Sequence, residues 1–140
     1  MVKVRETMTA DVRTVRPTAS LAEAARAMRE EDVGALPIAE GGELVGVVTD
    51  RDIVVRALSE DVDPHALYVS DVASRELVTV EPEQDLEDAL ALMARHQVRR
   101  VPVVENRHLV GMLAQADAAI VGDEAEVGDV LEKISRPAIE

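Results

Sequence analysis

The sequence predicts a mixed α/β (α+β) fold in which two β-α-β-β-α repeats pack sheet to sheet with pseudo-two-fold symmetry. Three observations predict this fold. The chain repeats itself at an offset of 65 residues, and its apolar residues switch between helical and strand spacing along each copy. In addition, 47% of the residues are apolar but only 1% are aromatic. The core must therefore be built from aliphatic side chains.

The repeat appears when the sequence is aligned with itself at an offset of 65 residues. Without a gap, 14 of the 50 positions from 4 to 53 are identical to their counterparts. The identities fall mainly on apolar and turn residues. Because about 50 residues bury too little surface to be stable alone, we expect the two copies to share one aliphatic core.

Each copy begins with a short extended piece, residues 14–15 or 77–80, followed by an amphipathic helix. Apolar residues at positions i, i+3, i+4 and i+7 predict this helix from Leu21 and again from Leu86. Ser20 and Glu23 have the spacing of a capping box at the first helix. Asp85 is the expected N-cap of the second helix.

A pair of strands and a closing helix complete each copy. Both strand pairs enclose a short polar turn that contains glycine or asparagine, which predicts an antiparallel hairpin. The closing helix is expected to start at Thr49 in the first copy and at Ala114 in the second. The expected strands are residues 35–39, 44–48, 100–104 and 109–113.

The repeat divides the chain into three expected regions. Residues 1–66 hold the first copy with an acidic linker at 59–66, and residues 67–124 hold the second copy. Residues 125–140 are expected to form a C-terminal helix and tail, because 127–130 repeats the pattern at 69–72.

The charge and composition exclude several classes of function. Fifteen Lys and Arg against 28 Asp and Glu give a net charge of −13, which repels phosphate backbones and anionic membranes. We therefore expect neither a nucleic acid nor a membrane as a partner. The chain has no cysteine, so a disulfide or a thiolate zinc site cannot form, and we expect no metal. No secretory signal or catalytic constellation is visible, which predicts a cytoplasmic protein that is not an enzyme.

Two seven-residue signatures carry a family resemblance. They read GVVTDRD from Gly46 to Asp52 and GMLAQAD from Gly111 to Asp117, and each follows a V-x-x-x-P motif at 33–37 or 98–102. The chain resembles the CBS domain family, and its tandem pair resembles a Bateman module. It is similar to the small stand-alone tandem-CBS proteins of bacteria, including those of the hypoxic-response type. This resemblance implies clefts between the copies that bind adenosine-containing ligands.

The resemblance implies that Asp52 and Asp117 bind the ribose hydroxyls of such a ligand, with Thr49 contacting the sugar or phosphate. A structural interpretation is equally open for Asp52, because Thr49-x-x-Asp52 is also a capping box. Asp117 lacks that partner, since Ala114 stands where the family has Thr or Ser. Its retention favours ribose binding at the second signature.

Arg99 and Arg100 occupy positions where related modules hold phosphates. Between Arg95 and His108 the chain has four arginines and two histidines but one acid, Glu105. Guanidinium groups suit phosphate because they form bidentate, charge-assisted hydrogen bonds. Ordinary ion pairs with the many acids elsewhere are the alternative interpretation.

The resemblance also implies two base pockets, one beside each aspartate. We expect the Asp117 pocket to take its walls from the first copy and the Asp52 pocket mainly from the second. The expected walls are Met8, Thr9, Ala10, Val33, Gly34 and Ala35 for Asp117, and Val72, Ala73 and Val98 for Asp52.

Together these features predict a regulatory module that binds AMP, ADP or ATP between its repeats and acts as an energy or stress sensor. The module requires no cofactor, and the resemblance implies a homodimer that controls an unknown protein. The alternative is a ligand-free dimeric stress-response or protein-interaction module, which Ala114 favours because the position lacks a hydroxyl.

Overall fold

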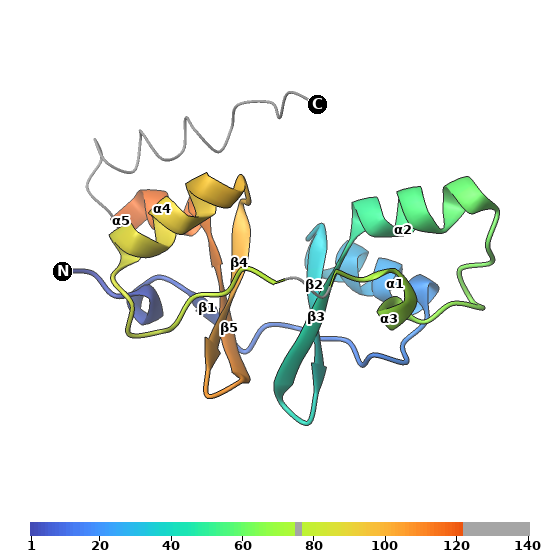
Figure 1. Ribbon diagram of the computed structural model, residues 1–140, viewed down its shortest axis with the longest axis horizontal. Helices are drawn as coiled ribbons and strands as arrows, with labels where there is room; N and C mark the ends of the chain where they lie inside the picture. Colours follow the sequence, from blue (N-terminus) through green and yellow to red (C-terminus); the bar gives the residue numbers. More distant parts are fainter. Residues whose placement is uncertain (75–76, 122–140) are drawn as a thin grey trace. The chain divides into compact units, whose positions relative to one another are not determined.

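The computed structural model describes residues 1–74 and 77–121, whose helices and strands are labelled in Figure 1. The chain divides into two compact units. Unit 1 combines Met1–Val12 with the chain from Val78 onward, and unit 2 consists of Arg13–Leu77. Both units combine helices with antiparallel strands, which confirms the predicted α+β class.

Unit 2 is built around an antiparallel hairpin of β2 and β3. Strand β2 pairs with β3 from Ala35 opposite Thr49 to Glu40 opposite Glu43, with a bulge between Ile38 and Ala39. Helices precede and follow the hairpin. The elements of unit 2 are α1 (Leu21–Glu31), β2 (Ala35–Glu40), β3 (Glu43–Thr49), α2 (Asp50–Arg56), the 3-10 turn η2 (Leu58–Glu60) and α3 (Val69–Val72).

Unit 1 has the same hairpin, formed by β4 and β5, with a bulge between Val103 and Val104. In addition, the short strand β1 pairs antiparallel with β5. The elements of unit 1 are the 3-10 turn η1 (Val4–Glu6), β1 (Thr9–Ala10), α4 (Leu86–His96), β4 (Arg100–Glu105), β5 (His108–Ala114) and α5 (Gln115–Val121).

The elements confirm the predicted duplication. Helices α1 and α4, strands β2 and β4, strands β3 and β5, and helices α2 and α5 all begin and end 65 residues apart. The bulges keep the same offset, as do the left-handed residues Asp32 and Gln97 that end α1 and α4. The expected leading strands are reduced to single parallel bridges, at Val15 and Val80.

The compact units do not coincide with the sequence repeats, because the segments in front of the repeats change places. In unit 1, the Val4 N–H donates to the Gln84 carbonyl (2.9 Å), so the start of the chain packs on the second copy. In unit 2, the Val69 N–H donates to the Ala19 carbonyl (2.8 Å). Each copy of the repeat is therefore completed by the segment that precedes the other copy.

The segment 59–66, expected as a linker between copies, lies within unit 2. There the Ala22 N–H donates to the Pro64 carbonyl (3.1 Å). The chain passes from one unit to the other at 12–13 and 77–78 instead. The expected helix and tail at 125–140 lie outside the described residues.

Each unit has its own cluster of buried aliphatic side chains, whereas the sequence led us to expect one shared core. The exchanged segments explain the difference. Val69 and Val72 join the cluster of unit 2, and Val4 joins the cluster of unit 1. Because each cluster is closed by a segment from elsewhere in the sequence, each unit buries more than one copy could.

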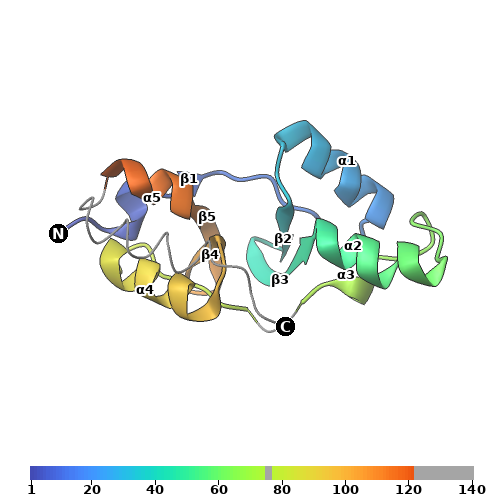
Figure 2. The same ribbon diagram turned by 90° about the horizontal axis from the view of Figure 1, so that it is seen from above.

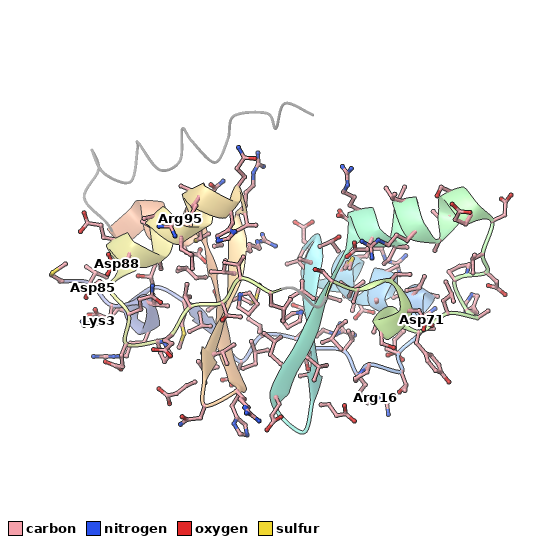
Figure 3. The ribbon with its side chains drawn as sticks, in the orientation of Figure 1. Lys3, Arg16, Asp71, Asp85, Asp88 and Arg95 are labelled. Carbon is pink, nitrogen blue, oxygen red and sulfur yellow. The ribbon has the colours of Figure 1, made fainter. Side chains whose placement is uncertain are left out.

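The two long helices begin differently from one another. Ser20 Oγ accepts a hydrogen bond from the Glu23 N–H (3.0 Å), which is half of the predicted capping box. Asp85 stands at the N-cap position of α4 but does not cap it, so that prediction is wrong. Its carboxylate instead accepts a hydrogen bond from Lys3 Nζ at 2.7 Å, as the neighbouring labels in Figure 3 show. This hydrogen bond raises the pKa of Lys3 above its ordinary value.

Within the described ranges 1–74 and 77–121, no helix has the length and apolar character that crossing a membrane requires.

Candidate ligand site

In both units the second hairpin strand runs directly into the helix that carries the signature aspartate. The first N–H of that helix donates to the carbonyl just before the hairpin: Asp50 to Gly34 (2.9 Å) in unit 2 and Gln115 to Arg99 (3.0 Å) in unit 1. These hydrogen bonds place residues 34 and 99 beside the first helical turn. The aspartate and the residues that open the hairpin therefore meet at one corner of each unit.

In unit 2 this corner is closed by local hydrogen bonds. The Thr49 N–H donates to Asp52 Oδ2 (2.9 Å), and the Asp52 N–H donates to Thr49 Oγ1 (3.1 Å), which completes a reciprocal capping box. Asp52 is half-buried. One of its carboxylate oxygens thus already serves the helix, and the role of Asp52 and Thr49 in ribose binding stays a prediction.

In unit 1 the equivalent corner is open. Ala114 has no hydroxyl group to cap α5. The Asp117 carboxylate is half-buried and has no hydrogen bond or ion pair with any residue that the structure describes. A half-buried carboxylate without a partner is costly to keep. Asp117 is therefore the better placed of the two aspartates to accept hydrogen bonds from a ligand.

Arg99 and Arg100 add positive charge to the same corner of unit 1. Arg100 pairs with Ala114 across the hairpin, and both arginine side chains are exposed. Neither forms an ion pair with a residue in the described part of the chain. The alternative interpretation, ordinary ion pairs, thus finds no partner there.

Their counterparts in unit 2, Gly34 and Ala35, carry no charge. A β-carbon added at Gly34 would lie 3.1 Å from Asp50 Oδ2, so a carboxylate stands where unit 1 has its guanidinium groups. The two corners therefore differ in electrostatic sign, as the sequence predicted from these positions.

Of the expected pocket residues for Asp117, Met8, Thr9 and Ala10 lie in the same unit. Strand β1 places Thr9 opposite Met112 and Ala10 opposite Gly111. A β-carbon at Gly111 would lie 2.6 Å from the Thr9 carbonyl oxygen and 2.9 Å from Met8 Sδ, so the exchanged segment touches β5 directly.

Of the expected pocket residues for Asp52, Val72 and Ala73 share unit 2 with it. Ser74 and Val47 exchange backbone hydrogen bonds (3.1 and 3.3 Å), which holds this segment against β3. Arg56 Nη1 donates to the Val72 carbonyl (3.0 Å) and ties the same segment to α2.

The remaining pocket residues lie in the opposite units from those expected. Val33, Gly34 and Ala35 belong to unit 2, and Val98 belongs to unit 1. Their pairing with Asp117 and Asp52 respectively stays a prediction.

Two further polar residues of unit 1 were missed by the sequence analysis. Thr7 Oγ1 and Gln115 Oε1 are buried without a hydrogen-bond partner among the described residues. Buried polar atoms are nearly always paired, so each calls for an explanation. Their repeat counterparts are Val72 and Asp50, and this change in polarity at equivalent positions was the signal that could have found them.

No cluster of three or more metal-binding side chains occurs within the residues that the structure describes. His65, His96 and His108 are all exposed, and His108 Nδ1 lies 3.0 Å from the Asn106 carbonyl oxygen.

Comparisons with known proteins agree with this architecture. The family model described as "CBS domain" matches residues 4–59 and 69–120. The CBS domain-containing protein YhcV of Bacillus subtilis is 43% identical over 141 residues, which cover 99% of either chain. Hypoxic response protein 1 of Mycobacterium tuberculosis is 39% identical over 120 residues, 85% of this chain and 84% of the relative.

Solved structures show the same fold. A crystal structure titled Hypoxic Response Protein I with two coordinated zinc ions has a TM-score of 0.78 at 39% identity, over 86% of this chain and 98% of the other. A CBS domain pair solved with methylthioadenosine and S-adenosyl-L-methionine has a TM-score of 0.75 at 24% identity, over 86% of this chain and 94% of the other. Two family matches, a relative that spans the whole chain and two 65-residue-offset units lead to one conclusion: the chain belongs to the CBS domain family and carries two CBS domains in tandem.

Proposed function

We propose that this chain is a regulatory CBS pair that binds a phosphorylated adenosine ligand, AMP, ADP or ATP, at the corner of unit 1 formed by Asp117, Arg99 and Arg100. Binding would report the energy or stress state of the cell to a partner protein. The single observation that carries the proposal is that a half-buried carboxylate and two arginines meet at this corner without partners among the described residues.

The chemistry of these side chains matches the two ends of a nucleotide. A carboxylate accepts hydrogen bonds from both vicinal ribose hydroxyls, and guanidinium groups bind phosphate oxygens in pairs. The net charge of −13 repels anions at long range, so an anion site needs a local excess of positive charge. The region around Arg99 and Arg100 supplies that excess.

By this proposal the chain is a binding protein and not an enzyme, and it needs no resident cofactor. Its regulatory effect follows from linkage: a partner that prefers the occupied form also tightens nucleotide binding by the same factor. Self-association of two copies belongs to the same proposal.

The test measures nucleotide binding by isothermal titration calorimetry and by thermal shift, with AMP, ADP, ATP and adenosine as probes. A nucleotide at a hundredfold its Kd should stabilise the protein by about 2.7 kcal/mol. Asp117→Ala should weaken binding of every probe about 10-fold or more, because one charge-assisted hydrogen bond is lost.

The arginines are separated from the aspartate by the choice of probe. The double variant Arg99→Ala with Arg100→Ala should weaken ATP binding while leaving adenosine binding unchanged. Arg95→Ala, an exposed arginine four residues away on α4, is the matched control. If millimolar nucleotides change neither the melting temperature nor the heat signal, the nucleotide proposal fails.

That failure would favour the second candidate function, a ligand-free dimeric module for protein interaction or stress response. Two observations favour this candidate: Ala114 lacks the hydroxyl of the family signature, and the Asp52 carboxylate is engaged by its own helix.

A further inference from the structure

The helix α2 exposes a row of apolar side chains that nothing in unit 2 covers. Val54, Val55 and Leu58 have 53%, 49% and 54% of their surface exposed. On the opposite side of the same helix, Ile53 and Ala57 are buried in the unit 2 cluster. Figure 1 shows α2 along the upper edge of its unit, and Figure 2, seen from above, shows it in front.

The exposed residues form a stripe along one helical face. Arg51, Val54, Val55 and Leu58 stand at positions i, i+3, i+4 and i+7, the spacing of one helical face. We call these four residues the α2 stripe. A surface helix normally carries its apolar residues on one side only, so an apolar second face indicates a contact outside the unit.

The charges at the two ends of the α2 stripe are opposite. Arg51 stands at its amino end, and Glu60 and Asp61 follow its carboxyl end. When two copies of this stripe lie antiparallel, Arg51 of each copy faces the acidic end of the other. The stripe is therefore complementary to itself, as a two-fold interface requires.

The other half of the chain does not repeat this pattern. The positions equivalent to the α2 stripe are Ala116, Ala119, Ile120 and Asp123, which lack both the arginine and the leucine. Because two copies of charge −13 repel each other, association needs a local surface that combines apolar area with opposite charges. Only the first half of the sequence provides that combination.

We propose that the α2 stripe is the centre of a two-fold interface between two copies of this chain, in which the helices α2 pair antiparallel. This contact rests on residues distinct from the candidate ligand corner in unit 1. It does not depend on nucleotide binding, so its test is performed on the full chain without nucleotide.

The test is sedimentation velocity and equilibrium over a range of protein concentrations. The wild type should sediment as a dimer, and Val54→Glu should raise the dimer dissociation constant about 30-fold or more, as the loss of a central apolar contact does. Val45→Glu is the matched control, because Val45 is also exposed (41%) in unit 2 but lies on β3 outside the stripe.

A charge exchange separates the antiparallel contact from a general loss of solubility. Glu60→Arg with Asp61→Arg should weaken the dimer, and adding Arg51→Glu should restore it. The proposal is overturned if Val54→Glu leaves the dimer intact, if Val45→Glu weakens it equally, or if the triple variant is no tighter than the double. It is also overturned if the wild type is monomeric at every concentration, in which case the stripe serves a different protein.

Discussion

The two units have the same elements at a constant offset of 65 residues, yet they differ in how completely their polar groups are paired. In unit 2, the signature aspartate is held by a capping box, and the hairpin turn uses two glycines. In unit 1, the signature aspartate is unpaired within the described residues, and Asn106 and Arg107 adopt the turn conformation at positive φ.

This difference indicates a division of labour within a duplicated fold. Local rules of stability are broken mainly where function requires it. Unit 2 follows these rules at its helix start and at its turn, whereas unit 1 departs from them and also buries two unpaired side-chain oxygens. The comparison thus supports unit 1 as the ligand-binding half, and the following predictions test it.

The largest difference should appear where the exchanged segment crosses each hairpin. A β-carbon would lie 2.6 Å from the Thr9 carbonyl oxygen at Gly111, but 3.3 Å from the Ser74 carbonyl oxygen at Gly46. Gly111→Ala should therefore destabilise the protein by about 3 kcal/mol, and Gly46→Ala by about 1 kcal/mol, since overpacking against backbone cannot be relieved by a side-chain movement.

Urea unfolding followed by circular dichroism measures both free-energy changes, and amide hydrogen exchange shows which unit loosens. In Gly111→Ala, protection should fall first in β4 and β5, and in Gly46→Ala in β2 and β3. Equal destabilisation by the two variants would contradict the difference in crossing distance.

The next effect concerns the start of the signature helices. Thr49→Ala removes the hydroxyl that accepts the Asp52 N–H, which should cost about 1 kcal/mol of stability. The reverse change, Ala114→Thr, should stabilise unit 1 by about 0.5 to 1 kcal/mol because it restores a capping box with Asp117.

Thermal unfolding measures both changes, and nucleotide titration of Ala114→Thr adds a second readout. If Asp117 binds a ligand, its engagement as a cap changes nucleotide affinity together with stability. A destabilising Ala114→Thr would show that the two helix starts are not equivalent.

A smaller effect is expected at the hairpin turns. Gly41 and Gly42 have φ of 60° and 84°, and their counterparts Asn106 and Arg107 have 51° and 70°. Arg107→Gly should stabilise the protein by about 0.5 to 1 kcal/mol, because a residue with a β-carbon is strained in this region. Gly42→Arg should destabilise it by a similar amount, and both changes can be read from urea midpoints. A neutral Arg107→Gly would show that the arginine makes a compensating contact.

The smallest effects concern pH, where the two units depend on different ion pairs. In unit 1, the hydrogen bond to Asp85 raises the pKa of Lys3, so its stabilisation is present at neutral pH and is lost as pH rises through that raised value. In unit 2, the hydrogen bond from Arg13 lowers the pKa of Glu30. That stabilisation is present above the ordinary glutamate pKa and is lost as pH falls through the lowered value.

Lys3→Met should therefore flatten the alkaline side of the stability profile, and Glu30→Gln should flatten its acidic side. Melting temperatures of both variants and the wild type, measured from pH 3 to pH 11 (about the range over which these groups titrate), compare the two slopes. Since both pairs are exposed, the changes should be small and should shrink further in high salt. An unchanged slope in either variant would remove that ion pair from the comparison.

Most of the fold could be predicted from local patterns. The spacing of apolar residues located the helices and strands to within about a residue or two, because this spacing decides which face of an element can be buried. The turn residues located both hairpins for the same reason. Asp85 was misjudged because an N-cap preference competes with any ammonium that the fold brings near, and Lys3 lies 82 positions away.

For the candidate site, residue type and spacing identified Asp117, Arg99 and Arg100. They could not show whether these groups are paired, since pairing depends on what the rest of the unit places beside them. Thr7 and Gln115 were missed because their polarity becomes notable only when burial is known.

The sequence by itself determined the repeat, the order of its elements, the turns and the charged residues at each corner, because these depend on spacing within a few tens of residues. Only the tertiary structure decided that Met1–Val12 completes the second copy and that the segment around Val69 completes the first. The two copies present nearly the same apolar surface to these segments. Which surface each segment joins is a matter of long-range packing, which no local pattern records.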